Sequence, residues 1–122
     1  YALMGTIYGF MEKFAIANKV LSTVVSKPSD NTAIGDIGFR GLSWMKDKLP
    51  SIESYDNIRV KNLLEDHIVL ESDANMPLEI GQQFVILPYY QDIMVNRWDN
   101  FIVVRNDVVE DVWDIPGRGG FH

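Results

Sequence analysis

The chain alternates apolar and polar residues over short runs that are separated by turn-forming residues. Residues 20–26 are rich in β-branched side chains and end at a Lys-Pro-Ser-Asp-Asn cluster, and residues 32–38 form a second short run. An alternation of period two places one set of side chains in a core and the other in water. Pro, Asp and Asn favour turns, so we predict two strands joined by a turn.

Five further runs have the composition of strands. Two of them are separated by only Asn106 and Asp107, which tolerate the positive φ that a two-residue hairpin turn requires. Residues 57–63 and 67–72 are close enough along the chain to pair as a second hairpin. The five predicted strands are residues 57–63, 67–72, 83–88, 98–105 and 108–113.

Helical spacing is confined to two stretches. Three apolar residues recur at helical spacing within residues 9–19, and residues 42–47 leave room for another short helix. Many short strands with turn signals between them are typical of antiparallel barrels and sandwiches. We therefore predict an all-β fold, an antiparallel β-barrel or sandwich with one or two short helices, in a single domain that spans residues 1–122.

Charge and composition narrow the classes of partner. The formal net charge is −6, and the 11 basic residues are scattered rather than clustered, which argues against a nucleic-acid-binding surface. The longest apolar runs are far shorter than the roughly 20 residues that span a bilayer, so we expect no membrane partner. The absence of cysteine excludes disulfides and thiolate chemistry. Without a leader-like segment at the start, we expect a cytoplasmic protein.

Several motifs occur in the same order as in a known family. Residues 21–28 read Leu-Ser-Thr-Val-Val-Ser-Lys-Pro, residues 34–43 read Ile-Gly-Asp-Ile-Gly-Phe-Arg-Gly-Leu-Ser, and residues 64–67 read Leu-Glu-Asp-His. Residues 87–92 follow as Leu-Pro-Tyr-Tyr-Gln-Asp, and residues 113–119 as Trp-Asp-Ile-Pro-Gly-Arg-Gly. Together they resemble the C-terminal β-domain of the D-serine dehydratase and D-threonine aldolase family. Its members are metal-activated, alanine-racemase-like enzymes that use pyridoxal phosphate (PLP).

The resemblance implies a metal site, with one substitution. In the family, a Pro-x-His-x-Cys or Pro-x-His-x-Asp stretch supplies metal ligands, and strand alternation would place both on one face. Tyr90 stands at the histidine position here and Asp92 at the carboxylate position. A phenol and one carboxylate hold zinc poorly, which favours a degenerate site. The alternative is a rebuilt zinc or manganese site in which His67 joins Asp92.

The resemblance also implies a ligand-binding groove. The positions that match the family's active-site side are Asp36, Arg40, His67, Tyr90 and Asp92. Asp36 beside Gly35 is equally suited to accept backbone N–H groups in a turn. A lone histidine in a hairpin is often structural or solvated.

The PLP barrel of the family has no counterpart in this chain. The lysines of this chain match no Schiff-base site. We therefore expect a stand-alone, non-catalytic β-domain without a cofactor of its own, which serves as an interaction or small-ligand-binding module. The alternative is a β-domain that completes the active site of a separately encoded PLP-dependent D-amino-acid dehydratase or aldolase. A fragment of a longer protein is also consistent with the sequence. Because barrel and second subunit cover this domain in the family, we expect a homodimer, with a PLP-barrel protein as the alternative partner.

Overall fold

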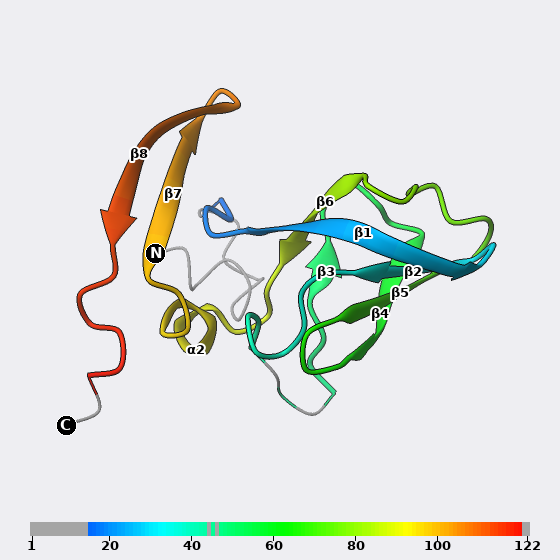
Figure 1. The fold of residues 1–122 in the computed structure, drawn as a ribbon, viewed down its shortest axis with the longest axis horizontal. Helices are drawn as coiled ribbons and strands as arrows, with labels where there is room; N and C mark the ends of the chain where they lie inside the picture. Colours follow the sequence, from blue (N-terminus) through cyan, green and yellow to red (C-terminus); the bar gives the residue numbers. More distant parts are fainter. Residues whose placement is uncertain (1–14, 44, 46, 121–122) are drawn as a thin grey trace.

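Six strands form one antiparallel sheet that nearly closes into a barrel (Figure 1). The computed structural model describes residues 15–43, 45 and 47–120. The strand order is β3-β6-β1-β2-β5-β4, and β3 and β4, at the two ends of this order, contact each other. The strands are β1 (Val20–Ser29), β2 (Thr32–Gly35), β3 (Ser51–Ile52), β4 (Ile58–Leu63), β5 (Ile68–Ser72) and β6 (Gln83–Leu87).

The long strand β1 pairs with two neighbouring strands along its length, and this bends the sheet. Its first half pairs with β6, from Val20 with Ile86 to Thr23 with Gln83. Its second half pairs with β2 from Val24 onward, with register irregularities between the pairs. Such irregularities increase local twist and let a sheet curve toward closure. The predicted strand over residues 20–26 and the turn after it are confirmed.

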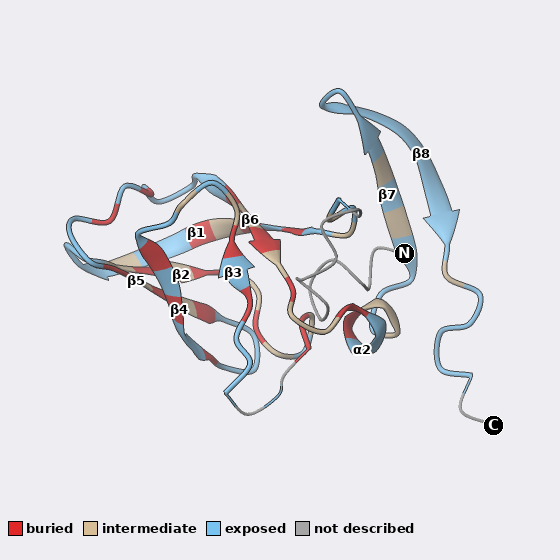
Figure 2. Ribbon diagram, turned by 180° about the vertical axis from the view of Figure 1, so that it is seen from behind, coloured by how far each residue is buried: buried red, intermediate tan, exposed pale blue. Residues whose placement is uncertain are grey.

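The core lies inside this barrel and follows the predicted alternation. Ile68 and Leu70 of β5 and Ile86 of β6 are fully buried, while their strand neighbours are more exposed. Burial of each such side chain contributes about 1.5–3 kcal/mol. The buried parts of the ribbon in Figure 2 are concentrated in the barrel, which confirms the all-β prediction.

The last two strands form a separate sheet beside the barrel. β7 (Asn100–Arg105) and β8 (Val108–Asp114) pair only with each other. Asn106 and Asp107 between them have φ angles of 49° and 62°, as a type I′ turn requires, so the predicted hairpin is confirmed. The five-residue helix α2 (Gln91–Val95) lies between barrel and hairpin (Figure 1).

Three features differ from the sequence-based expectations. The expected helix at residues 42–47 is not formed by its described residues, because Met45 instead makes an isolated bridge with Lys48. The sequence does not predict the two-residue strand β3, and α2 begins where the family resemblance implies strand alternation at Tyr90 and Asp92. Of the expected early helix, residues 9–14 lie outside the described residues, and residues 15–19 have no regular structure.

No helix within the described ranges is long and apolar enough to cross a membrane.

Gly38 allows two backbone segments to touch directly. The Phe39 N–H donates to the Leu64 oxygen at 2.8 Å, and the Arg40 N–H donates to the Glu65 oxygen at 3.1 Å. A Cβ atom on Gly38 would lie against both carbonyl oxygens, at 2.5 Å from that of Glu65. These two acceptors are backbone atoms and cannot swing away, so only glycine fits here.

We expect Gly38→Ala to lower the free energy of unfolding by about 1–3 kcal/mol, because the new methyl group separates the two backbones. Urea denaturation followed by tryptophan fluorescence measures the change. Gly117→Ala is the matched control, since a Cβ at Gly117 meets nothing within 4 Å. Equal stability of the two variants would contradict the close approach.

Candidate functional site

Residues 36–43, here called the junction loop, connect β2 to the segment before β3 and contact three other parts of the chain. One side of the loop bonds to the turn between β4 and β5 through Phe39 and Arg40. Within the loop, the Leu42 N–H donates to the Gly38 oxygen at 3.0 Å. This loop carries the family-like motif of residues 34–43, so its contacts decide where the predicted site residues lie.

Asp36 opens the loop and ties it back to β1. Its Oδ1 accepts hydrogen bonds from Ser22 Oγ and the Thr23 N–H, both at 2.8 Å. The slight burial of this carboxyl group acts to raise its pKa. The bonds from Thr23 and Ser22, with smaller help from the charge of His67, outweigh burial and hold the pKa of Asp36 below its usual value. Asp36 therefore acts as a turn carboxylate.

Three of the predicted ligand residues meet at this end of the barrel. Arg40 forms an exposed ion pair with Asp66 at 3.3 Å. His67 follows in the same turn, where its backbone oxygen accepts from the Leu64 N–H at 2.9 Å. Its side chain is exposed and near enough to Asp36 for its charge to act on that carboxyl group. Asp36, Arg40 and His67 thus lie at the same end of the barrel, and their role in ligand binding stays a prediction.

The other side of the junction loop is held by two residues that sequence reasoning missed. The Arg97 guanidinium donates to the backbone oxygens of Phe39 and Leu42, the second at 3.0 Å. Trp98 Nε1 donates to the Gly41 oxygen at 2.8 Å. Both residues directly follow α2, so these bonds attach the helix to the loop. Their acceptors are backbone carbonyl groups, which no side-chain pattern reveals.

Tyr90 and Asp92 do not lie on one face of a strand, and that prediction is wrong. Tyr90 is the residue before α2, and Asp92 lies in the first turn of this helix. The Tyr90 N–H donates to Ser43 Oγ at 3.3 Å, which fixes the start of the helix on the junction loop. Asp92 Oδ1 accepts from the adjacent Ile93 N–H at 2.8 Å.

An open hollow of about 530 Å³ runs along α2. It is lined by Asp92, Ile93, Asn96 and Arg97. Of the five residues predicted to line a groove, Asp92 alone contributes to this hollow. The structure therefore divides the predicted set, with Asp36, Arg40 and His67 at the barrel end and Tyr90 and Asp92 at the start of α2.

The described residues do not fit a resident metal ion. Among them, no three His, Cys, Asp or Glu side chains gather into a group that could hold one. Within the same ranges, no hydrogen bond or ion pair joins His67 to Asp92. A structural zinc site takes four protein ligands and a catalytic one takes three, so Asp92 with the phenol of Tyr90 falls short of either.

The described lysines do not fit a PLP site either. Lys19, Lys27 and Lys61 each pair with a carboxylate, of Glu53, Glu79 and Glu71 respectively. Lys48 lies over the Tyr89 ring, 5.2 Å from its centre. None of these four has the desolvated, unpaired setting that activates a Schiff-base lysine.

Comparison with known proteins finds relatives of this chain. The sequence profile of the family described as "Putative serine dehydratase domain" matches residues 17–104. D-threonine aldolase of Arthrobacter sp is 32% identical over 98% of this chain and 33% of the aldolase. 3-Hydroxy-D-aspartate aldolase of Paracoccus denitrificans is 28% identical over 82% of this chain and 25% of that enzyme.

The fold of this chain also matches a solved structure. The crystal structure of D-threonine aldolase from Filomicrobium marinum matches with a TM-score of 0.84 and 26% identity, over 90% of this chain and 30% of that protein. This chain therefore spans about a third of the length of these relatives, or less.

We expect Arg97→Ala to lower the free energy of unfolding by about 1–3 kcal/mol, because the oxygens of Phe39 and Leu42 lose their donor. Chemical denaturation measures the loss. Arg118→Ala, which removes an arginine paired with Asp99 at the surface, should cost at most about 1 kcal/mol. If the two variants were equally stable, Arg97 would not hold the loop.

The depressed pKa of Asp36 predicts a pH-dependent contribution to stability. The folded protein favours the ionised form, so the contribution is present above the unfolded pKa of about 3.9 and is lost as pH falls through the lower folded pKa. At pH 7, Asp36→Asn should cost about 1 kcal/mol, and the difference from wild type should vanish in acid. Denaturation across pH 2–7 tests this, with the exposed Asp56→Asn as control. A difference that persists in acid would contradict it.

Proposed function

This chain belongs to the serine dehydratase domain family, and we propose that it acts as a non-catalytic β-domain that docks with a PLP-dependent catalytic domain acting on D-amino acids. Two relatives named for aldolase activity on D-threonine and 3-hydroxy-D-aspartate support the substrate class. The chain corresponds to a third of the first and a quarter of the second. The remainder of such enzymes is the PLP barrel that the family resemblance implies.

The start of α2 is the observation that carries the proposal. Where the family motif supplies a metal-binding histidine, this chain has Tyr90, whose backbone is held by Ser43. Asp92 then stands alone as a carboxylate in the first turn. Together with the surface pairing of the described lysines, this supports a domain without reaction chemistry of its own.

The role left to the domain's residues is positioning. Arg97, Trp98 and Ser43 attach α2 to the junction loop, and Gly38 seats that loop on the β4–β5 turn. The segment that ends in Asp92 is therefore fixed relative to the barrel. A partner that docks on this side of the molecule would meet a preformed surface, with little ordering entropy to lose.

We expect the purified chain to contain neither metal nor PLP in stoichiometric amount. Elemental analysis tests the first expectation, and the absorbance of bound PLP tests the second. Added zinc or manganese should leave the melting temperature unchanged, because Asp92 lacks the partners that would bind the ion.

Asp92→Ala and His67→Ala distinguish the alternatives in the same experiment. On the proposal, both variants match wild type in metal content and in their response to added ions. A stoichiometric metal that is lost in Asp92→Ala would overturn the non-catalytic reading, and its loss in His67→Ala as well would identify the rebuilt site.

A further inference from the structure

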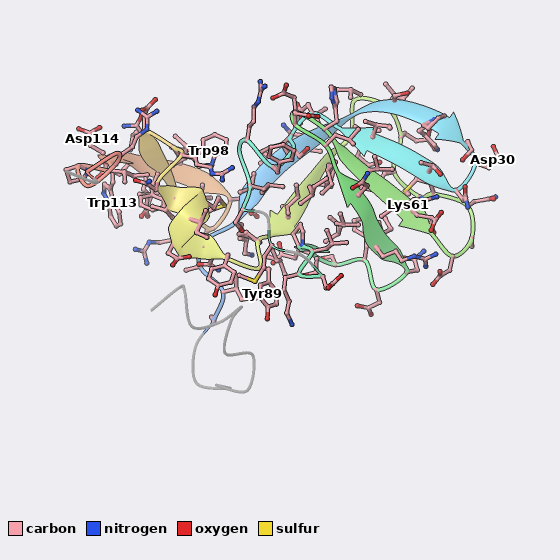
Figure 3. All side chains as sticks on the ribbon, turned by 90° about the horizontal axis from the view of Figure 1, so that it is seen from below. Asp30, Lys61, Tyr89, Trp98, Trp113 and Asp114 are labelled. Carbon is pink, nitrogen blue, oxygen red and sulfur yellow. The ribbon has the colours of Figure 1, made fainter. Side chains whose placement is uncertain are left out.

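The β7–β8 hairpin stands apart from the packed barrel. It pairs with no other strand among the described residues, and Figure 1 shows it beyond α2, to the side of the six-stranded sheet. Figure 3 shows Trp113 and Asp114 of β8 at the opposite end of the molecule from Asp30. A two-stranded hairpin alone is at best marginally stable in water, so this one requires a covering surface.

One face of the hairpin is aliphatic and open. The register pairs Ile102 with Val112 and Val104 with Val109. Ile102 and Val104 share a face by alternation. Their partners lie on the same face because a register irregularity between Val103 and Val104 adds one residue to β8. Their exposed fractions are 60%, 52%, 56% and 60% respectively. We call these four residues the outer face.

The opposite face is more covered. Phe101 and Val103 alternate with the outer-face residues of β7, and both are partly buried. That side is therefore less exposed to solvent than the outer face, although Trp113 of β8 remains 57% exposed. Single exposed apolar side chains are ordinary, but a contiguous set across two strands marks an interaction site.

The hairpin is also acidic. Residues 99–118 contain five acids and two arginines, a net charge of −5 + 2 = −3, which is half of the −6 of the whole chain. Both arginines are paired inside the segment, Arg105 with Glu110 at 3.0 Å and Arg118 with Asp99. For the remaining three acids, Asp107, Asp111 and Asp114, the described residues supply no cationic partner. A complementary surface would carry basic groups around an apolar centre.

These features argue against a second copy as the occupant. Four aliphatic side chains fall short of the ~800 Å² per partner that a stable interface buries. Pairing two hairpins would also bring two acidic segments together, and each carries −3. A different partner avoids both difficulties, since it can extend the contact and supply positive charge.

From this we infer that the outer face docks on the catalytic domain of the proposed function, at an apolar surface rimmed by Lys or Arg. This inference rests on the proposed function, and it names the surface through which the domain acts. The relatives supply the occupant, because about two-thirds or more of their length has no counterpart in this chain. Docking gives the hairpin the cover that the described part of this chain does not provide.

The test is a full-length chimera in which this chain replaces the matching third of Arthrobacter D-threonine aldolase. Differential scanning calorimetry reports whether the two parts unfold together. On the inference, the chimera has one cooperative transition, and Ile102→Thr/Val109→Thr releases a separate transition at the melting temperature of the isolated chain. Asp107→Asn/Asp111→Asn should weaken the shared transition, increasingly so at low salt.

A matched control is Val25→Thr/Ile80→Thr, which makes the same two exchanges at positions of the barrel that are 46% and 64% exposed. It should leave the chimera cooperative. In the isolated chain, Ile102→Thr/Val109→Thr should have the melting temperature of wild type, because solvent already surrounds the outer face. This comparison separates loss of docking from loss of folding.

Three results would overturn the inference, and they are distinguishable. Independent unfolding of the two parts in the unaltered chimera would refute docking and the proposed function together. A chimera that stays cooperative with the hairpin variant would refute the outer face alone. Light scattering adds a third test, since a dimer of the isolated chain that is lost in Ile102→Thr/Val109→Thr would assign the face to a second copy.

Discussion

The contact of the junction loop with the β4–β5 turn, backbone against backbone, is the constraint on which the arrangement of this domain depends. Gly38 permits the approach, and the N–H groups of Phe39 and Arg40 complete it. The far side of the same loop accepts the side chains of Arg97 and Trp98. This eight-residue loop therefore connects the barrel to α2 and to the hairpin. Its contacts fix the positions of Asp92 and of the hairpin.

The strands could be predicted where the local pattern decides the structure. β4 follows from period-two alternation, and β5, β7 and β8 follow from their β-branched and aromatic composition. Asn106-Asp107 fixes the last turn because both residues tolerate positive φ. α2 could not be predicted, because Ile93 and Val95 favour strands. Tertiary contacts override that preference: Met94 is buried, and Ser43 holds the backbone at Tyr90.

Only part of the candidate site could be predicted from the sequence. Asp36, Arg40 and His67 meet because the loop and turn that carry them bond to each other. Arg97 and Trp98 were missed because their acceptors are backbone oxygens of residues more than fifty positions away, and such groups carry no residue identity. The exposure of the hairpin was also beyond prediction, since alternation shows that a strand has an apolar face but not what covers it.

The turn at Asn106 and Asp107 has a consequence for how this domain can change over evolution. Two residues with positive φ set the pairing next to the turn, and a register irregularity between Val103 and Val104 separates it from the rest of the hairpin. Both strands pair only with each other and not with the barrel. Side chains on the hairpin can therefore be exchanged without disturbing the barrel. The hairpin already holds one extra residue in β8, because the irregularity absorbs it and keeps both aliphatic pairs on one face. A further insertion or deletion of one residue elsewhere in either strand would send its side chains to the opposite face.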